Sequence, residues 1–256
     1  MADVTALELI QAILEKTAAP DQRQSVDRVS AGDPTRAVTG VAVMAMATME
    51  CLNAAAAARC NLIVTYDPAF WSTNDRLTRV RTQALFAQKR DFLRQHDMVV
   101  LNLKDRMQQH VDTGMAQALG WQSEKDNSNL FRRPPATLLG LAQELGAKLN
   151  GTTLRVVGDP ALPVSLVATS FGDTARAPGL ALLNGPCDVL VLGYAHEWEV
   201  VEYAQDMISA GRRKGLVLLG EHASVESGVK YCAARFAEFI KDVPVMHIPG
   251  SEPVWN

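Results

Sequence analysis

The sequence has few cysteines, and they are not spaced as a covalent framework or a zinc site would need. The four cysteines, at positions 51, 60, 187 and 232, form no CxxC pair. Zinc knuckles and small disulfide scaffolds require cysteines at short, regular spacings. We therefore expect four reduced thiols, which are typical of a cytoplasmic protein.

A basic excess and long apolar runs are also lacking. The formal net charge is −3 at pH 7, whereas general nucleic-acid binders and membrane-surface proteins usually have an excess of Lys and Arg. No apolar run reaches the roughly 18 residues that a membrane span needs. The residues after Met1 do not have the basic and apolar segments of a signal peptide. Composition thus predicts neither a membrane nor a nucleic-acid partner.

Glycine-rich phosphate motifs and nucleophile elbows are missing too. Gly172 and Gly179 do not form a GxGxxG motif after a strand, and the sequence contains no GxSxG. The sequence therefore does not indicate a dinucleotide-binding loop or a serine nucleophile.

Apolar runs alternate with amphipathic segments along the 256 residues, a length sufficient for one large domain or two smaller ones. A helix with a Thr5–Glu8 capping box and Leu7 on its apolar face is predicted near the start. A long charged helix is predicted over 75–95, with Leu85 in its apolar stripe. Strands that alternate with helices predict an α/β fold of mixed sheets flanked by helices.

Three apolar runs end in ionisable residues, and they are the most informative positive feature. The runs are Leu62–Val64, Met98–Leu103 and Gly215–Gly220, followed by Thr65-Tyr66-Asp67-Pro68, Lys104-Asp105-Arg106 and Glu221-His222. Ligands in open α/β sheets bind at the carboxyl ends of strands. The three ends therefore predict one composite site.

Each of these ends also has a structural interpretation. Asp67, before Pro68, is either a metal ligand or acid–base group, or a turn former. Asp105 either points into the same crevice or belongs to a surface ion-pair cluster. His222 and Glu226 are four residues apart and would share a helix face, where they could chelate one divalent ion. Alternatively, the segment is simply a capped helix start.

At these residues the chain resembles the Nif-three-like family of dinuclear metal-centre hexameric proteins. Asn61–Trp71 is similar to the family's strand ending in Thr-His-His-Pro or Thr-His-Glu-Pro, and Gly220–Ser224 is similar to a later Gly-His motif. Further similar blocks are Gly32-Asp33-Pro34, Val38–Ala42, Ala47–Glu50, His196–Glu199, Val243–Val245 and Pro253–Trp255. Together the blocks extend through most of the chain.

The resemblance implies two α/β lobes that share a cleft, and a toroidal homo-hexamer whose sites face its inner cavity. In the family the C-terminal strand and helix can return to the first lobe, so we predict a first lobe of residues 1–133 and 216–256. The second lobe is then 134–215. Polar residues 122–135, ending in Pro134-Pro135, are the boundary that the sequence itself indicates. Relatives often have a GTP cyclohydrolase-type label.

The family's metal ligands are largely replaced here. Tyr66 and Asp67 stand where the first motif has His followed by His or Glu, and Lys104 and Gln108 stand where the second has His and an Asp or His four residues later. A two-metal site needs several imidazoles and carboxylates. A protonated lysine has no lone pair, so Lys104 could substitute for a metal cation by pairing with Asp67 or with a glutamate of the third motif.

The third motif, Gly-His with Glu four residues after the His, can be aligned in two ways. Without a gap its positions are Glu221 and Val225, whereas a one-residue shift gives His222 and Glu226. Both alignments stay open.

Two functions follow. As a metal-free binding or scaffold protein, the chain would attract a small anionic ligand through Lys104 and Arg106. As a metal-dependent hydrolase, it would bind zinc, manganese or iron and lower the pKa of a bound water. The ligand-binding candidates are Tyr66, Lys104, Asp105 and Glu221, and the metal candidates are Asp67, His222 and Glu226.

Overall fold

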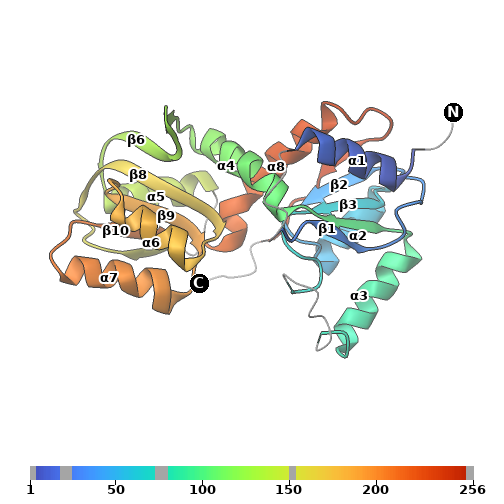
Figure 1. The fold of residues 1–256 in the computed structure, drawn as a ribbon, viewed down its shortest axis with the longest axis horizontal. Helices are drawn as coiled ribbons and strands as arrows, with labels where there is room; N and C mark the ends of the chain where they lie inside the picture. Colours follow the sequence, from blue (N-terminus) through green and yellow to red (C-terminus); the bar gives the residue numbers. More distant parts are fainter. Residues whose placement is uncertain (1–3, 18–24, 73–79, 150–153, 252–256) are drawn as a thin grey trace. The chain divides into compact units, whose positions relative to one another are not determined.

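The computed structural model describes residues 4–17, 25–72, 80–149 and 154–251. These residues form helices and two sheets (Figure 1). Their contacts divide the chain into two compact units, one within Met1–His110 and Val229–Ser251 and the other within Val111–Gly228. The chain passes between the units within α4 (Lys104–Leu119) and again within α8 (Glu221–Ala237).

The first unit contains a five-stranded sheet of order β1-β4-β3-β2-β11. Its strands are β1 (Arg28–Ala31), β2 (Val41–Met44), β3 (Leu62–Thr65), β4 (Val99–Asn102) and β11 (Val245–His247). All neighbours are parallel except the edge strand β1, which pairs antiparallel with β4. Every residue of β2, β3 and β4 is buried. Burial on both faces explains why these strands are continuous apolar runs rather than alternating ones.

The helices of the first unit pack through one apolar face each. They include α1 (Ala6–Lys16), α2 (Met49–Ala57) and α3 (Ala84–Gln95). The predicted capping box at Thr5 is confirmed, because Thr5 N–H donates to Glu8 Oε2 at 2.8 Å and Glu8 N–H donates to Thr5 Oγ1. Placing Leu7 on the apolar face was wrong: it is 45% exposed, since the buried stripe begins one residue earlier, at Ala6.

The long helix predicted over 75–95 is shorter in the structure. Residues 75–79 lie outside the described part of the chain, and α3 begins only at Ala84 after the extended backbone of Gln83. Leu85 is 48% exposed, so its inclusion in the apolar stripe was wrong. The buried residues of α3 are Phe86, Lys89 and Leu93.

The second unit contains a six-stranded mixed sheet of order β5-β6-β8-β9-β10-β7. Its strands are β5 (Ser123–Glu124), β6 (Asn127–Thr137), β7 (Arg155–Val157), β8 (Pro163–Asp173), β9 (Val189–Tyr194) and β10 (Gly215–Leu218). Its other helices are α5 (Leu138–Leu149), α6 (Arg176–Asn184), the π-helical turn η1 (Glu197–Val201) and α7 (Glu202–Ser209). Only β8–β9 and β9–β10 are parallel. Two mixed sheets with flanking helices confirm the predicted α/β class.

The polar residues 122–135, which the sequence indicates as a boundary, form β5 and most of β6. Pro134 and Pro135 lie where the pairing of β6 with β8 is interrupted, between Arg132 and Ala136. A proline has no N–H for a ladder hydrogen bond, so such an irregularity is where a strand tolerates it. The contacts of the chain divide after His110 and after Gly228, rather than at the predicted bounds of 133, 134 and 216.

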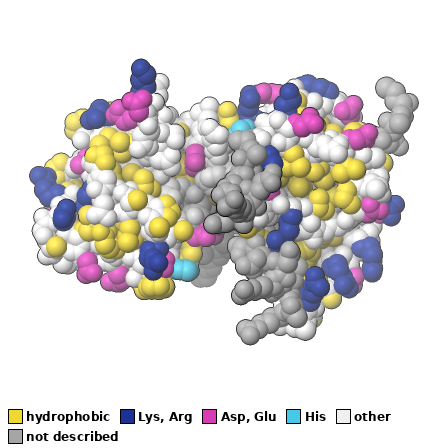
Figure 2. Space-filling view, viewed as in Figure 1, with side chains coloured by type: hydrophobic (Ala, Val, Ile, Leu, Met, Phe, Trp, Pro, Cys, Tyr) yellow, Lys and Arg dark blue, Asp and Glu magenta, His cyan; other side chains and the backbone are white. Residues whose placement is uncertain are grey.

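The described helices include none that is long and apolar enough to cross a membrane. Basic and acidic side chains are both present over the face of each unit seen in Figure 2. All four cysteines are buried, and none of them is in a disulfide. Burial raises the pKa of the Cys60 and Cys187 thiols, and that of Cys232 to about 12.

Substituting Gly193 with alanine is expected to destabilise the protein by about 2 kcal/mol. A Cβ at Gly193 would lie 2.5 Å from the carbonyl oxygen of Gly172 and against Ser224 Oγ, so backbone would have to move. Urea denaturation measures the change. Gly140→Ala is the matched control, because its Cβ would meet only Thr137 Oγ1, at 3.4 Å; it should be neutral or slightly stabilising. Equal effects of the two substitutions would contradict the prediction.

Candidate functional site

The ends of β3 and β4 are joined by an ion pair in the first unit. The two strands are parallel, and their register aligns Thr65 with Asn102, so the residues that follow leave the same edge of the sheet. Lys104 Nζ donates to Asp67 Oδ1 at 2.8 Å, and each side chain is 17% exposed. The sequence analysis predicts a pairing of Lys104 with Asp67, and the structure places these two side chains in contact.

Tyr66 lies beneath this ion pair. Its ring centroid is 5.0 Å from Lys104 Nζ, and its hydroxyl donates to Gln108 Oε1 at 2.5 Å. The amide of Asn102 donates to the Tyr66 carbonyl at 2.8 Å. Tyr66 has no exposed surface, so its ring forms part of the buried packing against the Lys104 ammonium group. A role in touching a ligand stays a prediction.

Asp105 and Arg106 are tied into the structure at the start of α4. The Asp27 carboxylate accepts the backbone N–H groups of Asp105 (2.9 Å) and Arg106 (3.2 Å), and Asp105 Oδ2 accepts the N–H of Val26 at 2.8 Å. Burial and the nearby Asp105 charge raise the pKa of Asp27, although the backbone hydrogen bonds oppose the rise. A carboxylate here satisfies the helix's first N–H groups and complements its dipole. Helix α4 therefore begins at Lys104.

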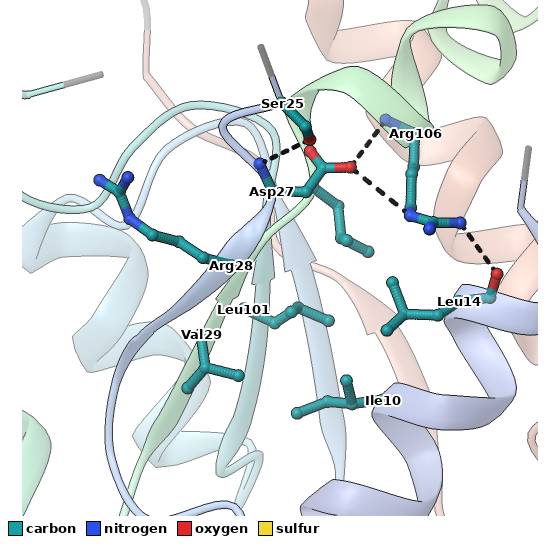
Figure 3. Close-up of a pocket in the computed structure, with 9 residues that line it drawn as sticks. Ile10, Leu14, Ser25, Asp27, Arg28, Val29, Leu101 and Arg106 are labelled. Carbon is teal, nitrogen blue, oxygen red and sulfur yellow. Dashed lines mark hydrogen bonds and ion pairs between the residues drawn. The ribbon is translucent and has the colours of Figure 1, made fainter. Parts of the chain in front are cut away.

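Arg106 closes one side of a cavity of about 330 Å³ (Figure 3). Its guanidinium donates to the carbonyls of Leu14 (2.9 Å) and Thr17 (3.1 Å), and its Nε lies 3.7 Å from Asp27 Oδ2. The apolar lining comes from Ile10, Leu14, Val29, Leu101 and Leu103. These contacts make Arg106 a link between α1 and α4.

The loop after β3 is hydrogen-bonded to a buried lysine of α3, Lys89. Lys89 is 1% exposed, donates a hydrogen bond to the Ala69 carbonyl, and lies 4.8 Å from the centroid of the Trp71 ring and 5.6 Å from that of Phe70. Burial lowers its pKa to about 8, although an electrostatic interaction with Cys51 opposes the shift. Trp71 has a φ of 57°, a left-handed conformation that bulky residues rarely adopt.

Sequence reasoning missed Lys89, although a signal was present. Phe86, Lys89 and Leu93 follow a three- and four-residue spacing, which places the lysine in the centre of an apolar helix face. A lysine in that position must either reach solvent or find an acceptor under the surface.

The third motif lies in the second unit. His222 Nε2 is 3.8 Å from Glu226 Oε2, with exposures of 19% and 22%, so the two residues share a face of α8 as their spacing predicts. Ser224 does not begin the helix, which starts at Glu221. Instead its buried Oγ accepts the Gly172 N–H at 3.0 Å and donates to the Glu221 carbonyl at 2.7 Å.

The predicted metal set is divided between the units. Asp67 belongs to the first, whereas His222 and Glu226 belong to the second, so their convergence stays a prediction. Within the described residues, no cluster of three or more His, Cys, Asp or Glu side chains is arranged to hold a metal ion. Glu221, the alternative to His222, is also a second-unit residue.

The described residues define a two-unit α/β protein with one sheet in each unit. The family model Duf34/NIF3 (NGG1p interacting factor 3) matches residues 5–252, and the chain belongs to this family. Among curated protein sequences, none matches this chain significantly.

Solved structures show the same fold. A Staphylococcus aureus hypothetical protein, SA1388, is 16% identical with a TM-score of 0.80, and 99% of each chain is covered. A Bacillus cereus protein related to NIF3 is 13% identical with a TM-score of 0.77 over 99% of each chain. Reduced HcgD from Methanocaldococcus jannaschii is 12% identical with a TM-score of 0.66, over 96% of this chain and 98% of that one. At such low identity the likeness shows the fold alone.

The buried Lys89 should contribute a stability that increases with pH above about 8. Its folded pKa of about 8 is below the value of about 10.4 in an unfolded chain. Between these pH values the unfolded chain binds a proton that the folded chain does not, so the contribution of Lys89 to the free energy of unfolding rises by roughly 3 kcal/mol at most. The buried thiols, whose pKa values are raised, contribute in the opposite sense, so urea denaturation from pH 7 to 10.5 isolates the Lys89 contribution only as the difference between wild type and Lys89→Met.

Lys89→Met should lack this contribution, because no buried amine then titrates, so the free energy of unfolding of wild type minus that of Lys89→Met should increase with pH. Lys241→Met is the control: Lys241 is exposed, so this variant should keep the wild-type profile. The same pH dependence in wild type and Lys89→Met would show that Lys89 is not the titrating group.

Proposed function

We propose that this member of the NIF3 family is a metal-independent binding or scaffold protein, in which Lys104 provides the positive charge that a metal would otherwise supply. The observation that supports this most directly is the 2.8 Å ion pair between Lys104 Nζ and Asp67 Oδ1. A protonated amine has no lone pair, so it cannot ligate a metal, and it already neutralises the carboxylate.

The side chains at this edge do not fit a dinuclear centre. Two divalent ions need several carboxylates and neutral imidazoles to fill their coordination shells. Here the first motif has one carboxylate, Asp67, which faces an ammonium group. The Tyr66 hydroxyl is hydrogen-bonded to Gln108, and Gln108 stands where the family has an acid or a histidine. We therefore infer no chemical step that runs through a metal.

A binding role agrees with the rigidity of this edge. Tyr66 supports Lys104, Asn102 fixes the Tyr66 carbonyl, and Lys89 fastens the following loop at Ala69. A ligand would meet side chains that are already ordered, which lowers the entropic penalty of association. The partly exposed ammonium of Lys104 favours a small anionic ligand.

The alternative is a metal-dependent hydrolase that uses Asp67, His222 and Glu226. Its support is the pair on α8, where His222 Nε2 lies 3.8 Å from Glu226 Oε2. A single ion on these residues would have to displace Lys104 from Asp67. We therefore favour the metal-independent role.

Family membership also leads us to propose a homo-hexamer. Sedimentation velocity measures the mass of the assembly directly. A monomer at micromolar concentration would contradict this proposal without affecting the one on metal.

The metal proposal predicts well under one metal ion per chain in protein purified without chelators or nickel affinity, even after soaking in manganese, zinc and iron salts. Lys104→His should retain more zinc than wild type, because it removes the fixed cation and adds a ligand beside Asp67. Elemental mass spectrometry per subunit measures both.

Lys241→His is the matched control, since it adds a histidine on an exposed side chain and should leave the metal content unchanged. One or more ions per wild-type chain would contradict the proposal and restore the hydrolase alternative.

A further inference from the structure

A cavity of about 200 Å³ opens in the first unit beside the loop that follows β3. Its lining comes from β1, the end of β4, the loop at 68–72 and the segment before α3. The lining residues with polar side chains are Arg28, Ser30, Ser72, Arg81 and Asn102. It therefore lies at the carboxyl end of the strands, where α/β sheets bind their ligands.

Strand register explains why Arg28 reaches this cavity. Arg28 pairs with Asn102, and Val29 pairs with Leu101, so Arg28 and Asn102 share one face of the sheet while Val29 and Leu101 share the other. Figure 3 shows that the Arg28 side chain extends away from Ile10 and Leu101; Arg28 and Val29 line both this cavity and the 330 Å³ cavity. Arg81 approaches from a different part of the chain, just before α3.

The charges of the lining are of one sign. Two guanidinium groups line the cavity, and its described lining residues include no carboxylate. Another cavity of the first unit, of about 270 Å³, differs in this respect, because Asp33 and Asp97 line it together with its arginines. A positive excess within one small concave site favours an oxyanion. Guanidinium forks also match the geometry of phosphate and carboxylate groups.

The wall of the cavity is held in place before any ligand binds. Ala69 and Phe70, which line it, are the residues that Lys89 contacts. The Asn102 amide is directed to the Tyr66 carbonyl at 2.8 Å. Trp71, next to the lining residue Ser72, keeps its left-handed backbone at φ 57°. Strained backbone of this kind is concentrated at binding sites.

We propose that this cavity binds a small molecule through a doubly charged oxyanion, with Arg28 and Arg81 as the two cationic contacts. The inference deepens the proposed binding role and rests on it, since it assigns the ligand class and the residues that recognise it. Phosphate groups and small dicarboxylates share this chemistry, and the two can be distinguished directly.

Isothermal titration calorimetry at low ionic strength tests the proposal, with inorganic phosphate and succinate as separate probes. Wild type should bind at least one of them, and 0.5 M sodium chloride should weaken the binding. Arg28→Ala and Arg81→Ala should each raise the dissociation constant about tenfold or more, since each removes a charge-assisted hydrogen-bonding group. Arg28→Lys should recover part of the loss, because it keeps the charge but not the fork.

Arg36→Ala is the matched control, because Arg36 lines the separate 270 Å³ cavity and pairs with Asp97 at 3.3 Å; it should bind like wild type. Should Arg28→Ala not fold, Arg81→Ala still tests the site, since Arg81 lies outside the helices and strands. Binding of phosphate alone assigns a phosphate-type ligand, and binding of succinate alone a dicarboxylate.

No binding of either probe by wild type, or binding by Arg28→Ala and Arg81→Ala as tight as that of wild type, would overturn the inference. Metal content measured on the same samples separates this failure from failure of the proposed function. Metal-free protein that binds neither probe refutes only the oxyanion site. Protein with a full metal complement refutes the metal-independent role.

Discussion

One partly buried ion pair organises the edge of the sheet where the candidate site lies. Lys104 is the first residue of α4, Asp67 follows β3, and their 2.8 Å contact ties the two chain segments together. The residues around the ion pair stabilise it and are not metal ligands. The Tyr66 ring contacts the Lys104 ammonium group, and the Asp27 carboxylate accepts N–H groups at the start of α4. Removing one partner would leave the other charge partly desolvated, which is strongly unfavourable.

The strands whose ends carry the candidate residues could be predicted, because a strand that is buried on both faces is a continuous apolar run in the sequence. Leu62–Thr65, Val99–Asn102 and Gly215–Leu218 are short, fully buried strands, and the sequence shows each as an apolar run that stops abruptly. The pairing of Lys104 with Asp67 could also be anticipated, since a cation in place of a metal ligand needs a nearby carboxylate.

Other parts depended on partners far away in the chain, which local patterns do not reveal. The start of α4 depends on Asp27, whose carboxylate accepts a backbone N–H of the helix. The first turn of α8 contains Ser224, whose hydroxyl accepts the N–H of Gly172. Strand β6 contains two adjacent prolines, which locally indicate a linker, and it is tolerated because its pairing with β8 is irregular there. The arginine-lined cavity likewise becomes visible only when strand register is known, whereas the spacing of Phe86, Lys89 and Leu93 does indicate the buried lysine.

The four buried thiols have a practical consequence. Burial raises the pKa of Cys60, Cys187 and Cys232, and Cys51 is only 2% exposed. Thiol reagents attack the thiolate of accessible cysteines, so the native side chains should react slowly. A cysteine introduced on each unit's surface would then be modified selectively in the otherwise natural chain. Paired spin labels or fluorophores at such positions could report distances between the two units in solution, with and without ligand.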